Sequence, residues 1–242
     1  MVRRMSMHLD LITMEEFKKG LRRTKTLLIP FGTVEEHGRH LPLGTDTLIA
    51  VEVLRRLQER RKVFVAPPLH YGVCTSTRLH PGTISITPET LRRLTLDIVR
   101  ESFRKGVRNF MLVSGHGGGL HMNALKETAE ILVEEEKGIR IAVVSPYELL
   151  WKELSEIAET ENDSHAGELE TSVMLALRPE LVKGRSKEEY PSFPKPLVVR
   201  DKLRYWPGGV WGNPSKADRE KGEKVIELIL DRLIEILDML ED

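Results

Sequence analysis

Short apolar runs alternate with amphipathic stretches along the chain, and this alternation is the strongest constraint on its fold. Four runs have the length and composition of buried strands: KTLLIPF (25–31), KVFVAP (62–67), RNFMLVS (108–114) and IRIAVVS (139–145). Apolar runs of this length, bounded by turn residues, are typical of strands that are covered on both faces.

The segments between these runs carry the signals of helices. Thr87 followed by Pro88 is a typical helix start, and Gly138 is a typical helix end. The predicted helices cover residues 14–23, 47–60, a segment beginning at Thr87, 120–137, 146–158, 167–177 and 216–240. Strands that alternate with helices predict an α/β fold with a mainly parallel sheet and helices on both of its faces.

The length of 242 residues fits one large domain, and we expect a single domain over residues 1–242. Residues 178–213 lack clear periodicity and contain PSFPKP and YWPGG. We interpret this segment as a long ordered excursion of the same domain and not as a linker.

Charge and cysteine content exclude several classes of partner and site. Lys and Arg number 37, as do Asp and Glu, so the net charge of zero argues against nucleic acid and anionic membranes as partners. The opening MVRRMSMHLDLITMEE interrupts any signal-peptide core, and we expect a cytoplasmic protein. Cys74 is the only cysteine, so a metal site would need histidine and carboxylate ligands. We interpret Cys74 itself as a small apolar residue.

Polar clusters follow three of the predicted strands directly. They are GTVEEHGRHLPLGTD (32–46), LHYGVCTSTRLHPGT (69–83) and SGHGGG (114–119). Because the carboxyl ends of parallel strands meet at one edge of a sheet, we expect these clusters to converge there. A fourth cluster, NDSHAGELETS (162–172), follows a later helix that can return to the same edge.

The first cluster holds three candidate ligands. Glu35 and His37 are two residues apart in an extended loop, and Asp46 closes the loop at a helix start. Taken alone, Asp46 is explained without a metal as a helix cap, and Glu35 as a solvated acid. Together with His116 and His165 in the other clusters, a metal site is favoured.

The glycine-rich SGHGGG segment has two interpretations. Its glycines are able to cradle a phosphate, but Leu120 occupies the place of the third glycine of a dinucleotide fingerprint and no Walker lysine follows. A histidine at the tip of a buried strand, with glycines that permit close backbone approach, suits a metal ligand better. His116 is therefore the candidate from this segment.

In HAGELETS, His165 precedes a helix whose first turn contains Glu168, with Glu170 two residues further on. Glu168 is able to serve simply as a partner of the helix dipole. The apolar VMLALRP that follows predicts a buried helix, in which an unpaired acid is costly and a metal ion would neutralise it.

Five motifs, in this order and over nearly the whole chain, resemble those of the creatininase (creatinine amidohydrolase) family. They are GTVEEHGRHLPLGTD, HPGTISITPETL, SGHGGG, HAGELETS and GVWGNPSKADREKG. The resemblance implies a three-layer αβα sandwich, a dinuclear divalent-metal site, hydrolysis of cyclic or linear C–N amide bonds, and often a hexamer. We accordingly expect a homo-oligomer.

The resemblance also implies residue roles. Glu35, His37, Asp46 and His116 match metal ligands, with Asp46 bridging, and His165 matches the histidine implicated in proton transfer. Creatininase has a glutamate ligand where this chain has Gly118, so the fifth ligand must come from elsewhere, and Glu168 is our candidate. Ser114, Gly119 and Glu36 also depart from the creatininase pattern, which argues against creatinine as the substrate.

We therefore expect a metal-dependent amidohydrolase that cleaves a non-peptide or cyclic C–N amide bond of a small molecule. Two divalent ions, of zinc, manganese or iron, would activate a bridging hydroxide, and His165 would protonate the leaving nitrogen. Two such ions bring four positive charges. Asp46, Glu35, Glu168 and the hydroxide would balance them.

Alternative functions remain open at this point. They are a formamide deformylase of flavin or deazaflavin synthesis, a peptide-trimming hydrolase, and a non-catalytic metal-binding scaffold. A nucleotide-binding module is disfavoured by the failed fingerprint. His80, Trp206 and Trp211 are candidates to line the substrate pocket, and Arg78 and Arg204 to meet an anionic substrate, but ordinary packing or solvation explains each of them as well.

Overall fold

The computed structural model describes residues 7–242, and its centre is a sheet of four parallel strands in the order β2-β1-β3-β4. The strands are β1 (Thr26–Phe31), β2 (Phe64–Val65), β3 (Asn109–Ser114) and β4 (Arg140–Val144). All four coincide with the predicted runs, although β2 keeps only two residues. Phe31 pairs with Ser114, so β1 and β3 end side by side.

The helices lie close to their predicted positions. They are α1 (Met14–Gly20), α2 (Thr45–Arg60), α3 (Pro88–Arg104), α4 (Gly119–Glu135), α5 (Pro146–Leu149), α6 (Trp151–Ile157), α7 (Glu168–Leu177) and α8 (Arg219–Glu241). The single helix expected at 146–158 is divided at Leu150 into α5 and α6. Helix α2 begins at Thr45, which places Asp46 in its first turn.

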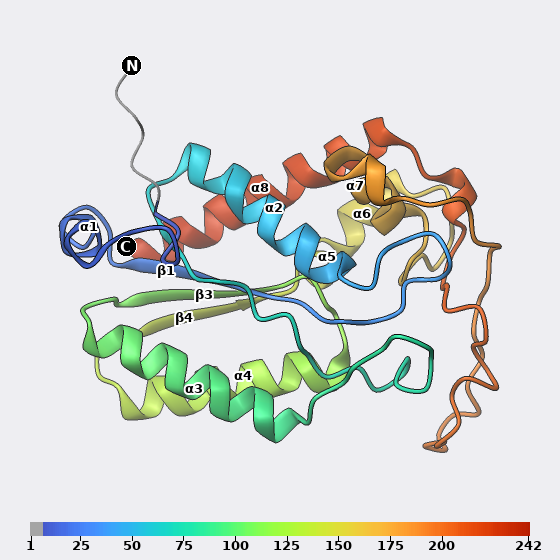
Figure 1. The fold of residues 1–242 in the computed structure, drawn as a ribbon, viewed down its shortest axis with the longest axis horizontal. Helices are drawn as coiled ribbons and strands as arrows, with labels where there is room; N and C mark the ends of the chain where they lie inside the picture. The colour runs from blue at the N-terminus through green and yellow to red at the C-terminus, as the bar shows by residue number, and fades with distance from the viewer. Residues whose placement is uncertain (1–6) are drawn as a thin grey trace.

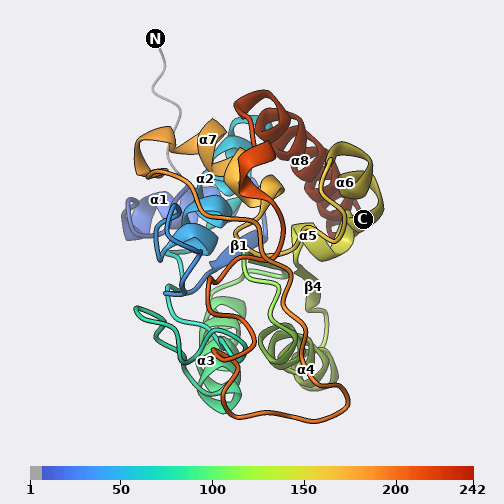
Figure 2. The same cartoon turned by 90° about the vertical axis from the view of Figure 1, so that its right-hand side faces the viewer.

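Helices cover the sheet on both faces, which confirms the predicted αβα sandwich. In Figure 1, α2 and α8 lie on one side of the strands, and α3 and α4 lie on the other; Figure 2 shows the same layers from the end. Alternate residues of β1 point to opposite cores. Leu28 packs with residues of α2, α7 and α8, whereas Leu27 and Ile29 pack with residues of α3 and α4.

Local sequence signals fix several helix starts. Thr13 and Glu16 form a capping box at α1, in which each side chain bonds the backbone of the other. Thr87 accepts a hydrogen bond from the amide of Thr90 at the start of α3. Asp218 does the same for the amide of Lys221 at α8. These bonds satisfy amide groups that a helix start leaves without a partner.

The excursion predicted at 178–213 contains one 3-10 turn (η1, Pro179–Leu181), and a second (η2, Pro214–Lys216) follows it. The segment runs along the end of the molecule where the loops after β1 and β3 emerge (Figure 1). Backbone hydrogen bonds between Trp211 and His165 tie it to the start of α7. Within residues 7–242, no helix is both long and apolar enough to cross a membrane.

Helices α7 and α8 approach so closely at Gly222 that no side chain fits there. A Cβ at this position would lie 1.9 Å from the carbonyl oxygen of Ser172, which belongs to the backbone of α7. We expect Gly222→Ala to lower the free energy of unfolding by about 2 kcal/mol or more, despite the better helix propensity of alanine.

Urea denaturation measures this loss, with Gly119→Ala as the matched control. Gly119 is the first residue of helix α4 and has no atom within 4 Å of an added Cβ, so its replacement should leave stability unchanged or slightly raised. Equal stability of the two variants would contradict the close packing of α7 on α8.

Candidate metal centre

Four of the predicted ligands meet at the carboxyl edge of the sheet. Glu35 and His37 come from the loop after β1, Asp46 from the first turn of α2, and His116 from the loop after β3. All four side chains are buried. The convergence expected from strand topology is therefore confirmed, although these residues are up to 81 positions apart in the sequence (His116 minus Glu35).

Asp46 lies between two imidazoles. Its Oδ1 is 3.1 Å from Nε2 of His37, and its Oδ2 is 3.3 Å from Nδ1 of His116. Thr33 also donates its hydroxyl to Oδ2. The backbone permits this approach because a Cβ at Gly115 would lie 2.1 Å from the carbonyl oxygen of Asp46. Each carboxylate oxygen of Asp46 therefore faces a different histidine.

Backbone carbonyls orient both histidines. Nδ1 of His37 donates to the carbonyl oxygen of Glu35 at 3.0 Å, and Nε2 of His116 donates to that of Val73 at 3.1 Å. The second nitrogen of each ring therefore faces the carboxylates. Metal-binding histidines in proteins are commonly held in this way, with the outer N–H on an oxygen acceptor.

His121, which the sequence analysis does not single out, supports His116 from behind. Its Nδ1 accepts a hydrogen bond from the amide of Val73 at 3.2 Å, and its ring stands edge-on to His116 at a centroid distance of 5.1 Å. Burial and the charge of His116 lower the pKa of His121 to about 3, so this ring is a neutral acceptor. Its position two residues after the start of α4, close to His116 in the sequence, was the signal that could have identified it.

Glu168 does not join these residues. Its buried carboxylate pairs with the ammonium group of Lys221 and accepts hydrogen bonds from the amides of Glu159 at 3.1 Å and Thr160 at 2.8 Å. Burial alone would raise the pKa of Glu168, but Lys221 and these amides lower it. The candidate fifth ligand is thus fully occupied in tying α7 to α8 and to the loop before α7.

Glu170 reaches the cluster instead. Its Oε2 lies 3.8 Å from Nε2 of His37 and accepts a hydrogen bond from the amide of Ala166 at 2.6 Å. Residues two apart on a helix project about 200° from each other, so Glu168 and Glu170 face opposite sides of α7. The expectation that Glu168 is the fifth ligand is therefore corrected: Glu170 faces the cluster, and Glu168 faces the opposite side of α7.

The crowded charges perturb one another strongly. Burial alone would raise the pKa of Glu35 and Asp46, but the histidines lower it, to about 2 for Glu35. Burial alone would lower the pKa of His37 and His116, but the carboxylates raise it, to about 10 for His37. Positive charge on the rings compensates the acids, and a divalent cation is able to take over this role.

The residues fit a divalent cation on two further observations. Within residues 7–242, Oε2 of Glu35 is buried with no hydrogen-bond partner beyond its ion pair with Nδ1 of His116 at 2.9 Å. Ligand atoms lie within 4.8 Å of one another in three groups among the described residues: Glu35, Cys74 and His116; Glu35, His37 and His165; and His37, Asp46 and Glu170. Nitrogen and carboxylate donors of this kind suit zinc, manganese and iron.

Cys74 departs from its interpretation as an ordinary apolar residue, since its sulfur lies beside Glu35 and His116. Burial and the charge of Glu35 raise the pKa of the thiol. A protonated thiol is a poor metal ligand, so Cys74 is not one of our proposed ligands.

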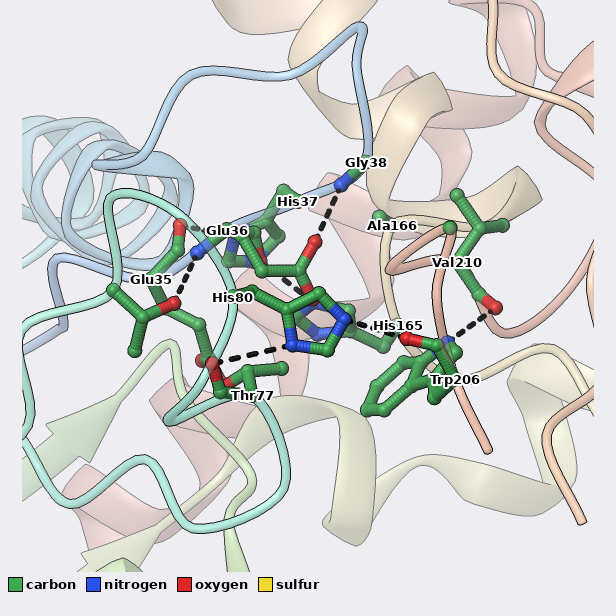
Figure 3. A network of polar contacts seen from close by, with 12 residues as sticks. Glu35, Glu36, His37, Gly38, Thr77, His80, His165, Ala166, Trp206 and Val210 are labelled. Atoms are coloured by element: carbon green, nitrogen blue, oxygen red, sulfur yellow. Dashed lines mark hydrogen bonds and ion pairs between the residues drawn. The ribbon is translucent and has the colours of Figure 1, made fainter. Parts of the chain in front are cut away.

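His165 stands at the edge of the cluster. Its Nε2 donates to the carbonyl oxygen of Glu36 at 2.8 Å, and its ring lies 4.3 Å from His37 and 5.2 Å from Trp206 between centroids. Figure 3 shows this histidine between Glu36 and Trp206. Since Nε2 is engaged by the backbone, Nδ1 is the nitrogen that remains to exchange a proton.

A cavity of about 390 Å³ opens in front of these side chains. Trp206 and Trp211 line it, as do Glu35, Asp46, His116, His165 and Glu170. His80 instead joins two loops through the carbonyl oxygens of Thr77 and Trp206 (Figure 3). Arg78 and Arg204 are not among the lining residues.

Two further members of the first motif hold its loop in place. Glu36 accepts a hydrogen bond from the amide of Gly38 at 2.9 Å. His40 lies between the hydroxyls of Ser186 and Thr171, at 2.9 and 2.8 Å. His40 therefore fixes the loop, and Glu36 supports it from outside the ligand cluster.

Comparison with known proteins adds independent findings. Residues 10–237 match the family model Creatininase, described as creatinine amidohydrolase. Creatinine amidohydrolase of Pseudomonas putida is 30% identical over 233 residues, 87% of this chain and 88% of that protein. The mycofactocin precursor peptide peptidase of Mycobacterium ulcerans is 31% identical over 220 residues, 85% and 82% of the two chains. A solved structure named Creatininase Mn has a TM-score of 0.86 at 26% identity and covers 98% of this chain and 100% of its own.

Loading this centre with zinc at pH 7 should release about two protons per chain, because ligation displaces the protons that the carboxylates hold on His37 and His116. Metal affinity should therefore rise with pH. Calorimetry in buffers with different ionisation enthalpies counts the protons. His121→Gln is the control and should leave the count unchanged, since burial keeps His121 neutral at pH 7. Zinc binding without proton release would contradict the assignment.

Proposed function

This chain belongs to the creatininase family, and we propose that it is a metal-dependent amidohydrolase acting on a non-peptide or cyclic C–N amide bond of a small molecule. The observation that carries the proposal is the buried cluster of carboxylates and imidazoles beside a cavity of about 390 Å³, with Asp46 between two oriented histidines. We take residues 1–242 as one catalytic domain.

Two divalent cations, of zinc, manganese or iron, would be held by five residues. Asp46 would be shared, Glu35 and His116 would hold one ion, and His37 and Glu170 the other. Three carboxylates would leave a net positive charge on the pair of ions. When bound, the ions would polarise the amide carbonyl and lower the pKa of a water molecule.

His165 would carry the proton to the leaving nitrogen. Burial and the charge of His37 lower its pKa, but the bond to Glu36 and the charge of Glu35 raise it above the usual value. The raised pKa favours the protonated ring that a general acid requires. The hydrogen bond from Nε2 to the Glu36 carbonyl holds the ring so that Nδ1 is available to the cavity.

The enclosed site favours a small substrate over a protein. A volume of about 390 Å³ lies within the range of small-molecule sites. Peptide trimming is a second candidate function, and the specific observation in its favour is the 31% identity to a mycofactocin precursor peptide peptidase. Hydrolysis assays on metal-loaded protein with cyclic amides, formamides and short peptides separate these candidates. Activity on peptides alone would overturn the first proposal.

Paired substitutions in α7 test the corrected ligand set. Glu170→Gln should lose about one of two metal ions, because a neutral amide replaces a charged ligand. Glu168→Gln should keep both ions but lower the free energy of unfolding by about 2 kcal/mol, since Lys221 then keeps only the exposed acids Glu159 and Asp218 and the carbonyl oxygen of Lys216 as partners. Elemental analysis and urea denaturation measure the two effects. Metal loss in the Glu168 variant alone would restore the original expectation.

His165→Ala separates metal binding from proton transfer. The variant should retain its metal, since His165 is outside the proposed ligands, and its kcat should fall by about 100-fold or more. Metal content and turnover of the best substrate are measured on the same sample. Full activity in the variant would show that another group protonates the leaving nitrogen.

A further inference from the structure

The cavity extends well beyond the metal centre. Besides the ligands, it is lined by residues of α5 and α6 and by the loop that precedes α7. These include Ser145, Tyr147 and Thr160, none of which takes part in the proposed chemistry. A substrate that places its amide bond at the metal centre would extend the rest of its structure toward this wall.

Three hydroxyls on this wall have no partner. The oxygen atoms of Ser145, Tyr147 and Thr160 are buried and, within residues 7–242, form no hydrogen bond. Ser145 and Thr160 are only 3% and 6% exposed. An unpartnered buried hydroxyl is unfavourable, and three of them around one cavity indicate that its contents supply their hydrogen bonds.

The charged side chains that line the cavity are mainly acidic. Among residues 7–242, no lysine or arginine lines it, whereas five carboxylates do: Glu35, Asp46, Glu148, Asp163 and Glu170. Glu148 and Asp163 remain after the three proposed ligands are subtracted. An anionic group placed away from the metal ions and from His165 would meet these two acids.

We propose that Ser145, Tyr147 and Thr160 form a substrate subsite for an uncharged group that both donates and accepts hydrogen bonds, such as a carboxamide or a hydroxyl. The enzyme then selects neutral polar amides over anionic ones. This inference rests on the proposed function, because the subsite acts on a molecule whose amide bond lies at the metal centre.

The chemistry of the wall supports a neutral group specifically. Hydroxyls donate and accept, and the neighbouring carboxylates accept, so N–H or O–H groups of a ligand find partners here. Burial raises the pKa of Tyr147, as do the nearby acids Glu170, Asp46 and Asp163, so its hydroxyl keeps its proton as a donor. A carboxylate would add like charge, and an apolar group would leave the hydroxyls unpaired.

Two sets of matched probes test the proposal. The linear set is N-acetylglycinamide, N-acetylglycine and N-ethylacetamide, and the cyclic set is 5-oxoprolinamide, 5-oxoproline and 2-pyrrolidinone. In each set the same amide carries a carboxamide, a carboxylate or no polar group. Binding is measured by calorimetry on zinc-loaded His165→Ala protein, in which turnover should be blocked, and hydrolysis on the zinc-loaded wild type.

In at least one set, the carboxamide should bind about tenfold more tightly than either of its counterparts. Tyr147→Phe, Ser145→Ala and Thr160→Val, each added to His165→Ala, should bring the ratio of these dissociation constants toward one. Tyr71→Phe is the matched control, because Tyr71 is 50% exposed and does not line the cavity; it should keep the ratio. Three separate variants keep the test valid if one of them fails to fold.

The outcomes for the subsite and for the proposed function are distinct. A carboxamide preference that disappears in the subsite variants supports the subsite, whether or not any probe is hydrolysed. Preference without hydrolysis of any amide would count against the proposed function alone. Equal or tighter binding of the carboxylates, no binding of any probe, or a ratio that survives in all three variants would overturn the subsite.

Discussion

The structure depends on the burial of like charges at one edge of the sheet. Glu35, Asp46 and Glu170 lie within a few ångströms of His37, Glu35 and Asp46 also lie beside His116, and all three acids are almost completely removed from water. Carboxylates in such a place are stable only with positive charge among them. Protonated His37 and His116 supply it in the protein alone. The hydrogen bonds from both rings to backbone carbonyls turn the other ring nitrogens toward these acids, where cations would bind.

Much of this centre was predictable because it follows from topology. Parallel strands end at a common edge, so motifs after β1 and β3 had to meet there. The sequence position of Glu35, His37, Asp46 and His116 was therefore sufficient to place them together. The supporting contacts were not predictable, because Val73 lies in a loop without a periodic signal, and the helix pattern over 120–137 does not show that His121 meets this loop.

Glu168 and Glu170 show where prediction from sequence stops. Both are acids in the first turn of a buried helix, and both need a compensating partner. The sequence does not show which face of α7 meets the metal centre, because that depends on how α7 packs on α8. Lys221, which is buried on α8, pairs with Glu168, and this pairing fixes which face of α7 meets the metal centre. Gly222, beside Lys221, permits the close approach of α7 and α8.

In our proposals, different segments of the chain carry the reaction and the choice of substrate. The proposed ligands come from the loops after β1 and β3 and from the starts of α2 and α7, whereas the hydroxyls of the cavity wall come from residues 145–160, after β4. Changes in this second segment would therefore alter what the cavity accepts without moving a ligand. For the same reason, the motifs of the metal centre predict hydrolysis of an amide, and their departures from the creatininase pattern argue against creatinine, but they do not identify the amide that enters.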